Sequence, residues 1–211
     1  MKKLLTVAAL LSCMGLAEMN AQETKPVDNR ANFGQMMFVA PEPAIMIGTY
    51  DAQGVPDVMM AAWGSQCGRD EIMIHLSEHK TTENLRLKRA FTVSFATKET
   101  VGQSDYLGMV SAHEVPGKLT KVGFTVHKSP NVDAPIVDQY PVTIECQVVS
   151  FEKGVLIGKV VNTSADKSVL DDQGNIDFGK LHPVVFDPVS NTYREVGEVV
   201  GQAWKSGETY K

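Results

Sequence analysis

The sequence predicts a mainly β protein, an antiparallel barrel or sandwich that carries a few short helices. Short apolar runs alternate with turn signals from about residue 33 onward, at the spacing that is typical of all-β folds. Segments with helical periodicity are few. Two pairs of apolar runs are also joined by Gly-containing turns, as in hairpins. We therefore expect many of the strands to pair with their neighbours along the chain.

Each predicted hairpin consists of a strand, a turn and a strand: residues 44–50, 51–54 and 58–63, then residues 142–149, 152–154 and 155–161. Three further strands are predicted, the last of them as the final strand of the chain: residues 71–76, 90–96 and 183–187. A short helix is expected over residues 103–110. No internal repeat is present.

Another short helix is predicted after residue 80. Thr81 or Thr82 can cap it, because a hydroxyl group can accept a hydrogen bond from the free N–H groups of the first turn. Glu83 lies in the first turn, and Lys88 and Arg89 lie in the last. Each of these charges suits the helix dipole.

Residues 1–21 are predicted to be a signal peptide. Two lysines precede the apolar stretch 4–11, which is too short to span a bilayer. Cleavage is expected after Ala21, and residues 15–17 form a second candidate site.

Residues 10–13 also resemble a bacterial lipoprotein box, in which Cys13 would carry the lipid. Soluble export and lipid anchoring both stay open, so we expect the periplasm or cell envelope of a bacterium, with membrane contact only through such an anchor. A linker over residues 22–32 and one domain over residues 33–211 are expected to follow.

Composition and motifs argue against several classes of function. The formal net charge is −5, and no long basic run offers a surface for nucleic acid. The sequence contains no G-x-S-x-G, H-E-x-x-H, P-loop or G-x-G-x-x-G motif, and its five histidines lack metal-ligand spacing. No metal site and no catalytic side chain is predicted. Cys67 and Cys146 match no redox or zinc motif, and we expect two buried thiols rather than a disulfide.

Two neighbouring segments suggest a site for a phosphorylated ring. Ser77 ends a strand, and Lys80, Thr81 and Thr82 stand at a helix start, where free N–H groups attract an anion. Residues 57–64 place small residues beside Trp63, as a ledge for a flat ring would. Together they indicate a flavin mononucleotide (FMN). Separately, each fits an ordinary capped helix or a core strand with a packed Trp.

Several segments also resemble, in matching order from about Phe38 to the C-terminus, the flavin reductase-like, flavoredoxin-type family. The similar blocks are residues 54–64, 79–85, 91–95, 105–111, 132–135 and 193–197. The resemblance implies a homodimeric Greek-key split β-barrel that holds FMN near the dimer interface. It also implies electron transfer between a small redox donor and an acceptor, such as NAD(P)H or another redox protein.

Carried over to this chain, the resemblance predicts four cofactor contacts: Asp57 before the second hairpin strand, Trp63, the helix-cap residue Thr81, and Lys118. The other expected contacts lie in the ledge and at the helix start: Ala61, Ala62, Ser77, Lys80, Thr82 and Asn84.

Asp57 departs from the family, which usually has Asn at this position. A carboxylate can accept a hydrogen bond from the flavin N3–H, but its charge would oppose an anionic reduced flavin. Alternatively, the carboxyl group is protonated or paired with Lys118. Two other functions stay open: a split barrel that binds haem or a pyridoxal-type phosphate, and a non-catalytic dimer of the cell envelope.

Overall fold

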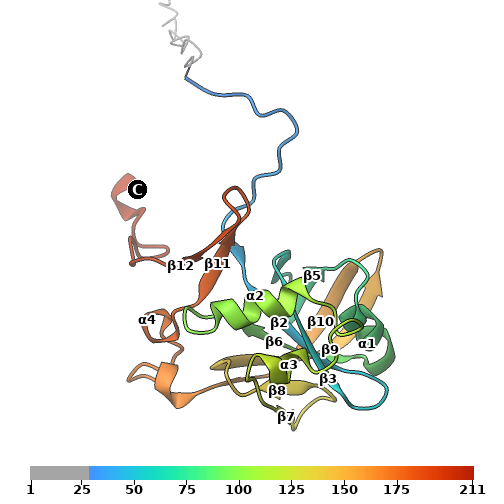
Figure 1. Ribbon diagram of the computed structural model, residues 1–211. Coiled ribbons are helices and arrows are strands. Elements are labelled where there is room, and N and C mark those ends of the chain that lie inside the picture. The colour runs from blue at the N-terminus through green and yellow to red at the C-terminus, as the bar shows by residue number, and fades with distance from the viewer. Residues whose placement is uncertain (1–28) are drawn as a thin grey trace, which may run out of the picture. The chain divides into compact units, whose positions relative to one another are not determined.

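The computed structural model describes residues 29–211 (Figure 1). The predicted signal peptide, Cys13 and the first part of the predicted linker lie outside these residues. The chain divides into one unit up to Met37 and a second, compact unit over Phe38–Lys211, which contains every strand and helix found in residues 29–211. The domain start at residue 33 stays a prediction.

A curled antiparallel sheet of seven strands dominates the compact unit, and its order is β3-β2-β6-β9-β10-β5-β4 (Figure 1). The strand bounds are β2 Ile45–Tyr50, β3 Pro56–Ala61, β4 Gly64–Gln66, β5 Glu71–His75, β6 Ala90–Phe95, β9 Val142–Glu152 and β10 Val155–Ala165. All pairs in this sheet are antiparallel. The predicted mainly β split-barrel fold is confirmed.

Both predicted hairpins are present. Strands β2 and β3 pair from Ile45 opposite Ala61 to Tyr50 opposite Pro56. Strands β9 and β10 are longer than expected and turn at Lys153 and Gly154, which have φ angles of 51° and 81°. The register of β9 against β10 shifts by one residue between Ile157 and Gly158, and such an irregularity helps long strands to bend, as a curled sheet requires.

Short elements surround the sheet. The helices are α1 Lys80–Lys88, α2 Val101–Met109, α3 Lys118–Lys121, α4 Phe178–Leu181, and the 3-10 turns η1 Lys167–Val169 and η2 Glu208–Tyr210. A small sheet has the order β1-β11-β12, and a separate hairpin pairs β7 with β8. Their bounds are β1 Glu42–Pro43, β7 Val126–Lys128, β8 Pro135–Val137, β11 Val184–Asp187 and β12 Thr192–Glu195.

The expectation that residues 183–187 form the final strand was wrong. Strand β12 follows β11 and pairs with it, with Tyr193 opposite Phe186. In β12 only Tyr193 is half-buried, while its neighbours are exposed. The strand therefore lacks the apolar alternation by which a half-buried strand is recognised.

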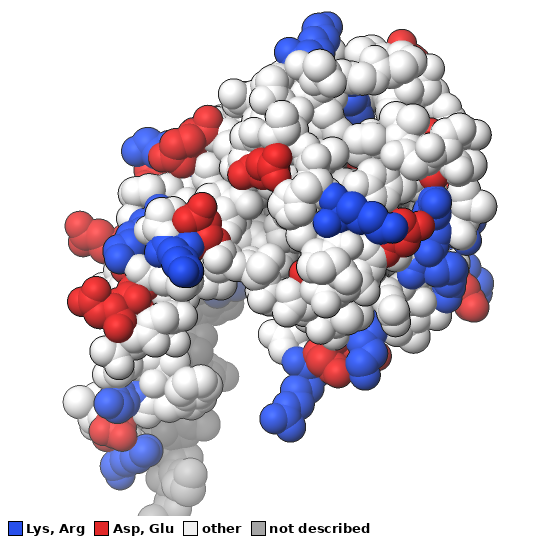
Figure 2. All heavy atoms as spheres, turned by 90° about the horizontal axis from the view of Figure 1, so that it is seen from below, with Lys and Arg blue, Asp and Glu red and all other residues white. Residues whose placement is uncertain are grey.

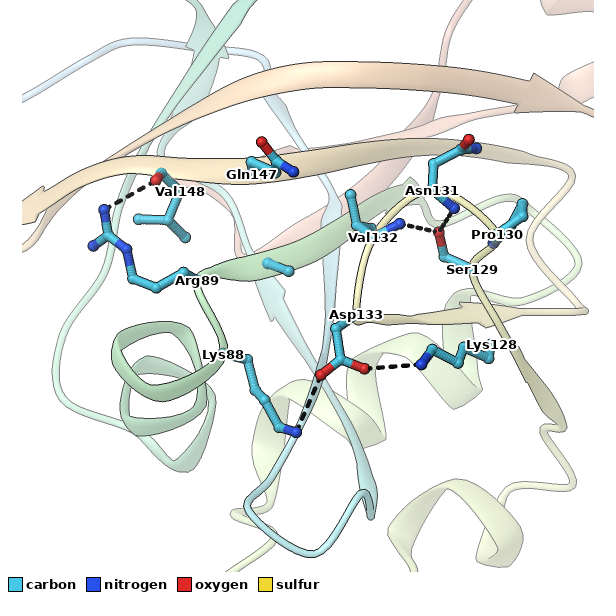
Figure 3. Close-up of a pocket in the computed structure, with 11 residues that line it drawn as sticks. Lys88, Arg89, Lys128, Ser129, Pro130, Asn131, Val132, Asp133, Gln147 and Val148 are labelled. Atoms are coloured by element: carbon cyan, nitrogen blue, oxygen red, sulfur yellow. Dashed lines mark hydrogen bonds and ion pairs between the residues drawn. The ribbon is translucent and has the colours of Figure 1, made fainter.

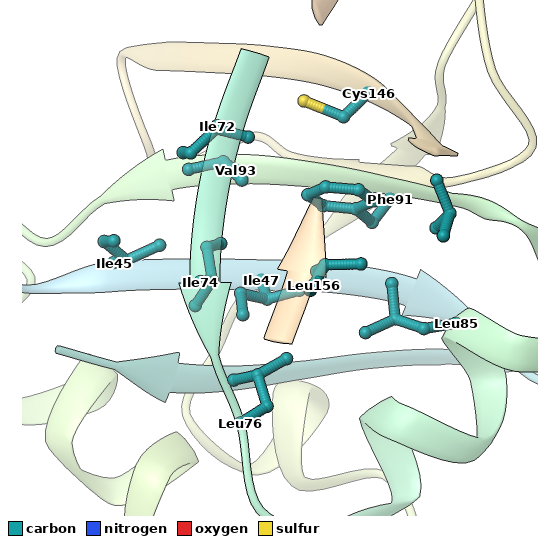
Figure 4. Packing of buried hydrophobic residues seen from close by; sticks show 11 residues of the cluster. Ile45, Ile47, Ile72, Ile74, Leu76, Leu85, Phe91, Val93, Cys146 and Leu156 are labelled. Carbon is teal, nitrogen blue, oxygen red and sulfur yellow. The ribbon is translucent and has the colours of Figure 1, made fainter. Parts of the chain in front are cut away.

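Strand β2 is apolar on both faces because each face packs into a different apolar cluster. Ile45 and Ile47 belong to the cluster inside the curled sheet, together with the fully buried Phe91 and Leu156 (Figure 4). Met46 belongs to a second cluster, which includes residues of α2 and α3. Successive side chains of a strand point to opposite faces, so β2 is covered on both faces.

A buried carboxylate on β9 fixes the loop between β7 and β8. Glu145 is 1% exposed and accepts a hydrogen bond from the Ser129 hydroxyl. The Asn131 amide donates to both of its carboxylate oxygens, at 3.0 and 3.1 Å, and the amide of Asn162 in β10 donates at 2.6 Å. Burial opposes its ionisation, but the hydrogen bonds outweigh this effect and lower the pKa of Glu145. The network ties the loop to the sheet.

The two cysteines of the described chain are both free. Cys146 is buried, and burial raises the pKa of its thiol to about 12. Cys67 is exposed, so the expectation of two buried thiols was wrong for Cys67, which lies in a loop after the short strand β4. In residues 29–211, no helix is long and apolar enough to cross a membrane.

Candidate functional site

The start of α1 has the features of an anion site. His79 is the N-cap residue, and its backbone is extended. Within residues 29–211, the backbone N–H groups of Lys80 and Thr81 have no hydrogen-bond acceptor, and neither has the half-buried Lys80 ammonium group. Free N–H groups at the positive end of a helix attract anions, and a cation beside them adds to this attraction.

Thr81 and Thr82 do not cap the helix as predicted. Both lie inside α1, because the N-cap is His79, two or three residues earlier than expected. Thr82 closes the first turn: its Oγ1 accepts from the N–H of His79 at 2.9 Å and donates to the His79 carbonyl at 2.8 Å. The side chain at the third helical position thus binds back to the N-cap backbone, as in a capping box.

A cavity of about 160 Å³ connects this helix start with the predicted ledge. Of the predicted residues, Ala61, Ala62, Trp63 and Ser77 line it. His75 and His79 line it too, although no sequence pattern distinguishes them from the other three histidines. The ring centroids of Trp63 and His75 lie 5.7 Å apart. Trp63 is 62% exposed, so the ledge is open to a ligand.

Asp57, Thr81 and Lys118 come together directly beneath the surface. Asp57 lies within β3 rather than before it, and its Oδ2 accepts from the Thr81 hydroxyl at 2.7 Å. The Lys118 Nζ lies 3.1 Å from Asp57 Oδ1, and both side chains are 4% exposed. Lys118 also donates to the carbonyls of Leu107 and Val110 at the end of α2, at 3.0 Å each. One ion pair therefore joins β3, α1, α2 and α3.

The geometry of this pair leaves one acceptor position unused. Lys118 Nζ approaches Asp57 Oδ1 closely but not along a hydrogen-bonding direction, so Oδ1 is buried without a hydrogen-bond donor. A buried acceptor without a donor is costly, which fits a ligand N–H at this position.

Asn84 and Thr82 have structural partners. The Asn84 amide donates to Thr49 Oγ1 at 3.1 Å and so fastens α1 to β2. Both side chains are buried and line none of the cavities described here. Of the ten predicted residues, the structure thus places four on the cavity and three in the buried group of Asp57, Thr81 and Lys118, while Lys80 stands at the helix start and Thr82 and Asn84 fasten α1.

A second cavity, of about 280 Å³, lies on the other side of the ledge. It shares Met60, Ala61 and Ala62 with the first cavity and is closed by Asp105 of α2 and Tyr193 of β12. Asp105 and Tyr193 belong to the blocks that resemble the family, but no role was predicted for them. Their contact joins positions 88 residues apart, which no local pattern shows.

A further cavity, of about 540 Å³, lies at the opposite end of α1 and contains no predicted residue. Its basic groups already have partners. Lys88 and Lys128 both point toward Asp133, at 3.1 and 3.4 Å, and Arg89 donates to the Val148 carbonyl at 3.0 Å (Figure 3). This cavity therefore offers no unpaired cation to a phosphate.

The face of the molecule shown in Figure 2 carries charges of both signs. On the face shown in Figure 2, acidic and basic side chains lie interspersed around a largely uncharged area. Among residues 29–211, no group of His, Cys, Asp and Glu is arranged to hold a metal ion.

Comparison with known proteins identifies the family. The family model for the flavin reductase like domain matches residues 37–186, which is most of the chain. The chain belongs to the flavin reductase-like family. No curated protein matches it.

Solved structures of the flavin reductase-like family share the fold. Flavoredoxin of Desulfovibrio vulgaris (Miyazaki F) is 32% identical, with a TM-score of 0.81, and the match covers 85% of this chain and 100% of that chain. Flavoredoxin from Methanosarcina acetivorans is 23% identical, with a TM-score of 0.79 and coverages of 86% and 99%. An FMN-binding domain of a flavin reductases-like enzyme from Shewanella baltica is 18% identical, with a TM-score of 0.67 and coverages of 76% and 89%.

Proposed function

We propose that the chain binds FMN and works as an oxidoreductase or electron carrier of the flavoredoxin type. The observation that carries this proposal is the cavity in which Ser77 and His79, at the start of α1, face Ala61, Ala62 and Trp63. An anion-binding helix start beside a ledge of small and aromatic side chains matches the two ends of FMN. Family membership supports a flavin as the ligand.

The residues divide into four groups by what they would do. Lys80, Ser77 and the N–H groups at the start of α1 would hold the phosphate, and Ala61, Ala62 and Trp63 would support the ring. Asp57 Oδ1 has an acceptor position for a ring N–H, while Thr81 and Lys118 hold that carboxylate in place. Thr82 and Asn84 would act by fixing α1. The chemistry that a flavin supplies when bound is hydride and single-electron transfer, which requires no catalytic side chain.

The first test removes the one unpaired cation described at the helix start. Lys80→Ala should weaken FMN binding by about 1.5–3 kcal/mol, roughly ten- to a hundredfold, because hydrogen bonds to charged groups contribute that much. Thr81 is left unchanged, since Thr81→Val would also deprive Asp57 of its donor. The measurement is a titration that follows the quenching of flavin fluorescence at fixed ionic strength.

Lys167→Ala is the matched control, because Lys167 lies in η1, is exposed, and makes no side-chain hydrogen bond or ion pair within residues 29–211. Its dissociation constant should equal that of the unchanged protein. Equal FMN affinity in the Lys80→Ala and Lys167→Ala variants would reject the phosphate site.

Substitutions of Asp57 and of Lys118 should shift the reduction potential of bound flavin in opposite directions. As a pair they are neutral, so Asp57→Asn leaves a positive charge that favours the anionic reduced flavin and raises the potential. An effect of ~1.4 kcal/mol corresponds to about 30 mV for two electrons. Lys118→Met should lower the potential, and the double variant should return close to the original value.

Potentiometric titration of the four proteins at one pH measures this pattern. Identical potentials in all four would show that the flavin ring does not lie near the pair.

We also propose that the protein is a homodimer with FMN near the interface. Trp63 supports this, because an aromatic side chain beside the ledge stays 62% exposed in the single chain. Light scattering of the FMN-loaded protein should give twice the chain mass at micromolar concentration. A monomer with FMN still bound would contradict the proposal.

Export to the bacterial cell envelope remains a proposal from residues 1–21 alone, with Cys13 as the position of a lipid anchor. The mass of the mature N-terminus separates cleavage after Ala21 from lipidation at Cys13. An intact Met1 after expression in a secreting host would oppose both.

A further inference from the structure

The cavity of about 280 Å³ beside the ledge has apolar walls and one polar corner. Met60 of β3, Met109 of α2 and Phe186 of β11 contribute apolar surface, and Asp105 and Tyr193 form the corner. Helix α2 can lie this close to β3 because Gly108 has no side chain. A Cβ there would come within 2.9 Å of the Met60 Cβ.

The polar corner contains a carboxylate oxygen that accepts no hydrogen bond from residues 29–211. The Tyr193 hydroxyl donates to Asp105 Oδ1 at 2.7 Å and lies 3.1 Å from the Met60 sulfur. Burial, followed by the nearby carboxylate, raises the pKa of Tyr193, so the phenol keeps its proton. Asp105 Oδ2 has no hydrogen-bond donor among residues 29–211.

The apolar walls and the polar corner together favour an aromatic ring that carries a hydroxyl group. Thioethers and aromatic edges make favourable contacts with aromatic rings. A free carboxylate oxygen accepts a hydrogen bond from a ligand O–H, and such O–H···O⁻ bonds are short and strong. The volume lies near the lower end of small-molecule sites and suits a single ring.

We propose that this cavity binds a single-ring aromatic molecule that carries a hydroxyl group and donates from it to Asp105. Because Met60, Ala61 and Ala62 line both cavities, such a ring would lie beside the proposed flavin ledge. The assignment of this aromatic molecule as the second substrate of the flavin rests on the proposed function. The existence of the binding site does not depend on the proposed function.

The experiment compares p-cresol with toluene, which has the same ring and methyl group but no hydroxyl. Flavin-free protein with ¹³C-labelled methionine methyl groups is titrated with each, and Met60→Leu and Met109→Leu assign the two signals of the cavity. We expect p-cresol to shift both signals and to bind about tenfold tighter than toluene. Equal affinities, or unchanged Met60 and Met109 signals, would overturn the proposal.

Variants of the corner separate binding from a general effect on the fold. Asp105→Asn should reduce the preference for p-cresol several-fold. Tyr193→Phe should preserve it, because it frees Asp105 without removing the acceptor. Tyr50→Phe, on β2 outside the cavity, is the control and should change nothing. Loss of the preference in Tyr50→Phe, or its retention in Asp105→Asn, would contradict the assignment.

The same titration on FMN-loaded protein distinguishes this proposal from the proposed function. We expect p-cresol to bind with a similar dissociation constant and to perturb the flavin absorption. Competition between p-cresol and FMN would mean that the flavin itself occupies the cavity, and the proposal would fail. A chain that binds p-cresol but no FMN would keep this site and reject the proposed function.

Discussion

Lys118→Met should lower the free energy of unfolding by about 3–5 kcal/mol, because it leaves the Asp57 carboxylate buried without its cation. The Leu107 and Val110 carbonyls lose their donor in the same variant. Urea unfolding monitored by circular dichroism measures the loss.

Adding Asp57→Asn to Lys118→Met should recover most of this stability, since both charges are then absent and the Thr81 hydroxyl keeps an acceptor. Exposed Lys167→Met is the control and should stay within about 0.5 kcal/mol of the original protein. A loss below 1 kcal/mol in Lys118→Met would mean that the pair is not formed in solution.

Phe91→Ala should cost about 3–5 kcal/mol, because Phe91 is fully buried at the centre of the core inside the curled sheet (Figure 4). Gly158 of β10 faces the ring so closely that a Cβ at this position would overlap Phe91. Gly158→Ala alone should therefore cost about 1–3 kcal/mol through overpacking.

The two changes should be strongly coupled. With Phe91 shortened to Ala, the methyl group of Gly158→Ala enters vacated space, so its cost should vanish or become a gain. Unfolding free energies of the four proteins give the coupling energy. Additive losses would contradict the packing of Phe91 against Gly158.

Local pattern was sufficient to predict the fold class and both hairpins. Alternating apolar residues and Gly-containing turns are properties of short segments, and they located β2, β3, β5, β6, β9, β10 and β11. The pattern did not reveal β12, whose single half-buried residue, Tyr193, packs against a partner far away in sequence.

The candidate site was partly predictable for the same reason. The helix start near Lys80 and the small residues beside Trp63 are local signals, and the structure places Ser77 and His79, which precede that helix, on one cavity with the small residues. The cap was misassigned because His79 is an unusual N-cap, whereas Thr81 and Thr82 have the preferred hydroxyl. The ion pair of Asp57 with Lys118 was one of the alternatives left open, since only the fold brings together residues so far apart in sequence.

The central claim is that the chain holds FMN, and the visible absorption spectrum of the purified protein tests it most directly. We predict a yellow protein with flavin bands that releases about one FMN per chain when it is denatured. A Soret band, or a colourless protein that takes up no added FMN, would contradict the claim.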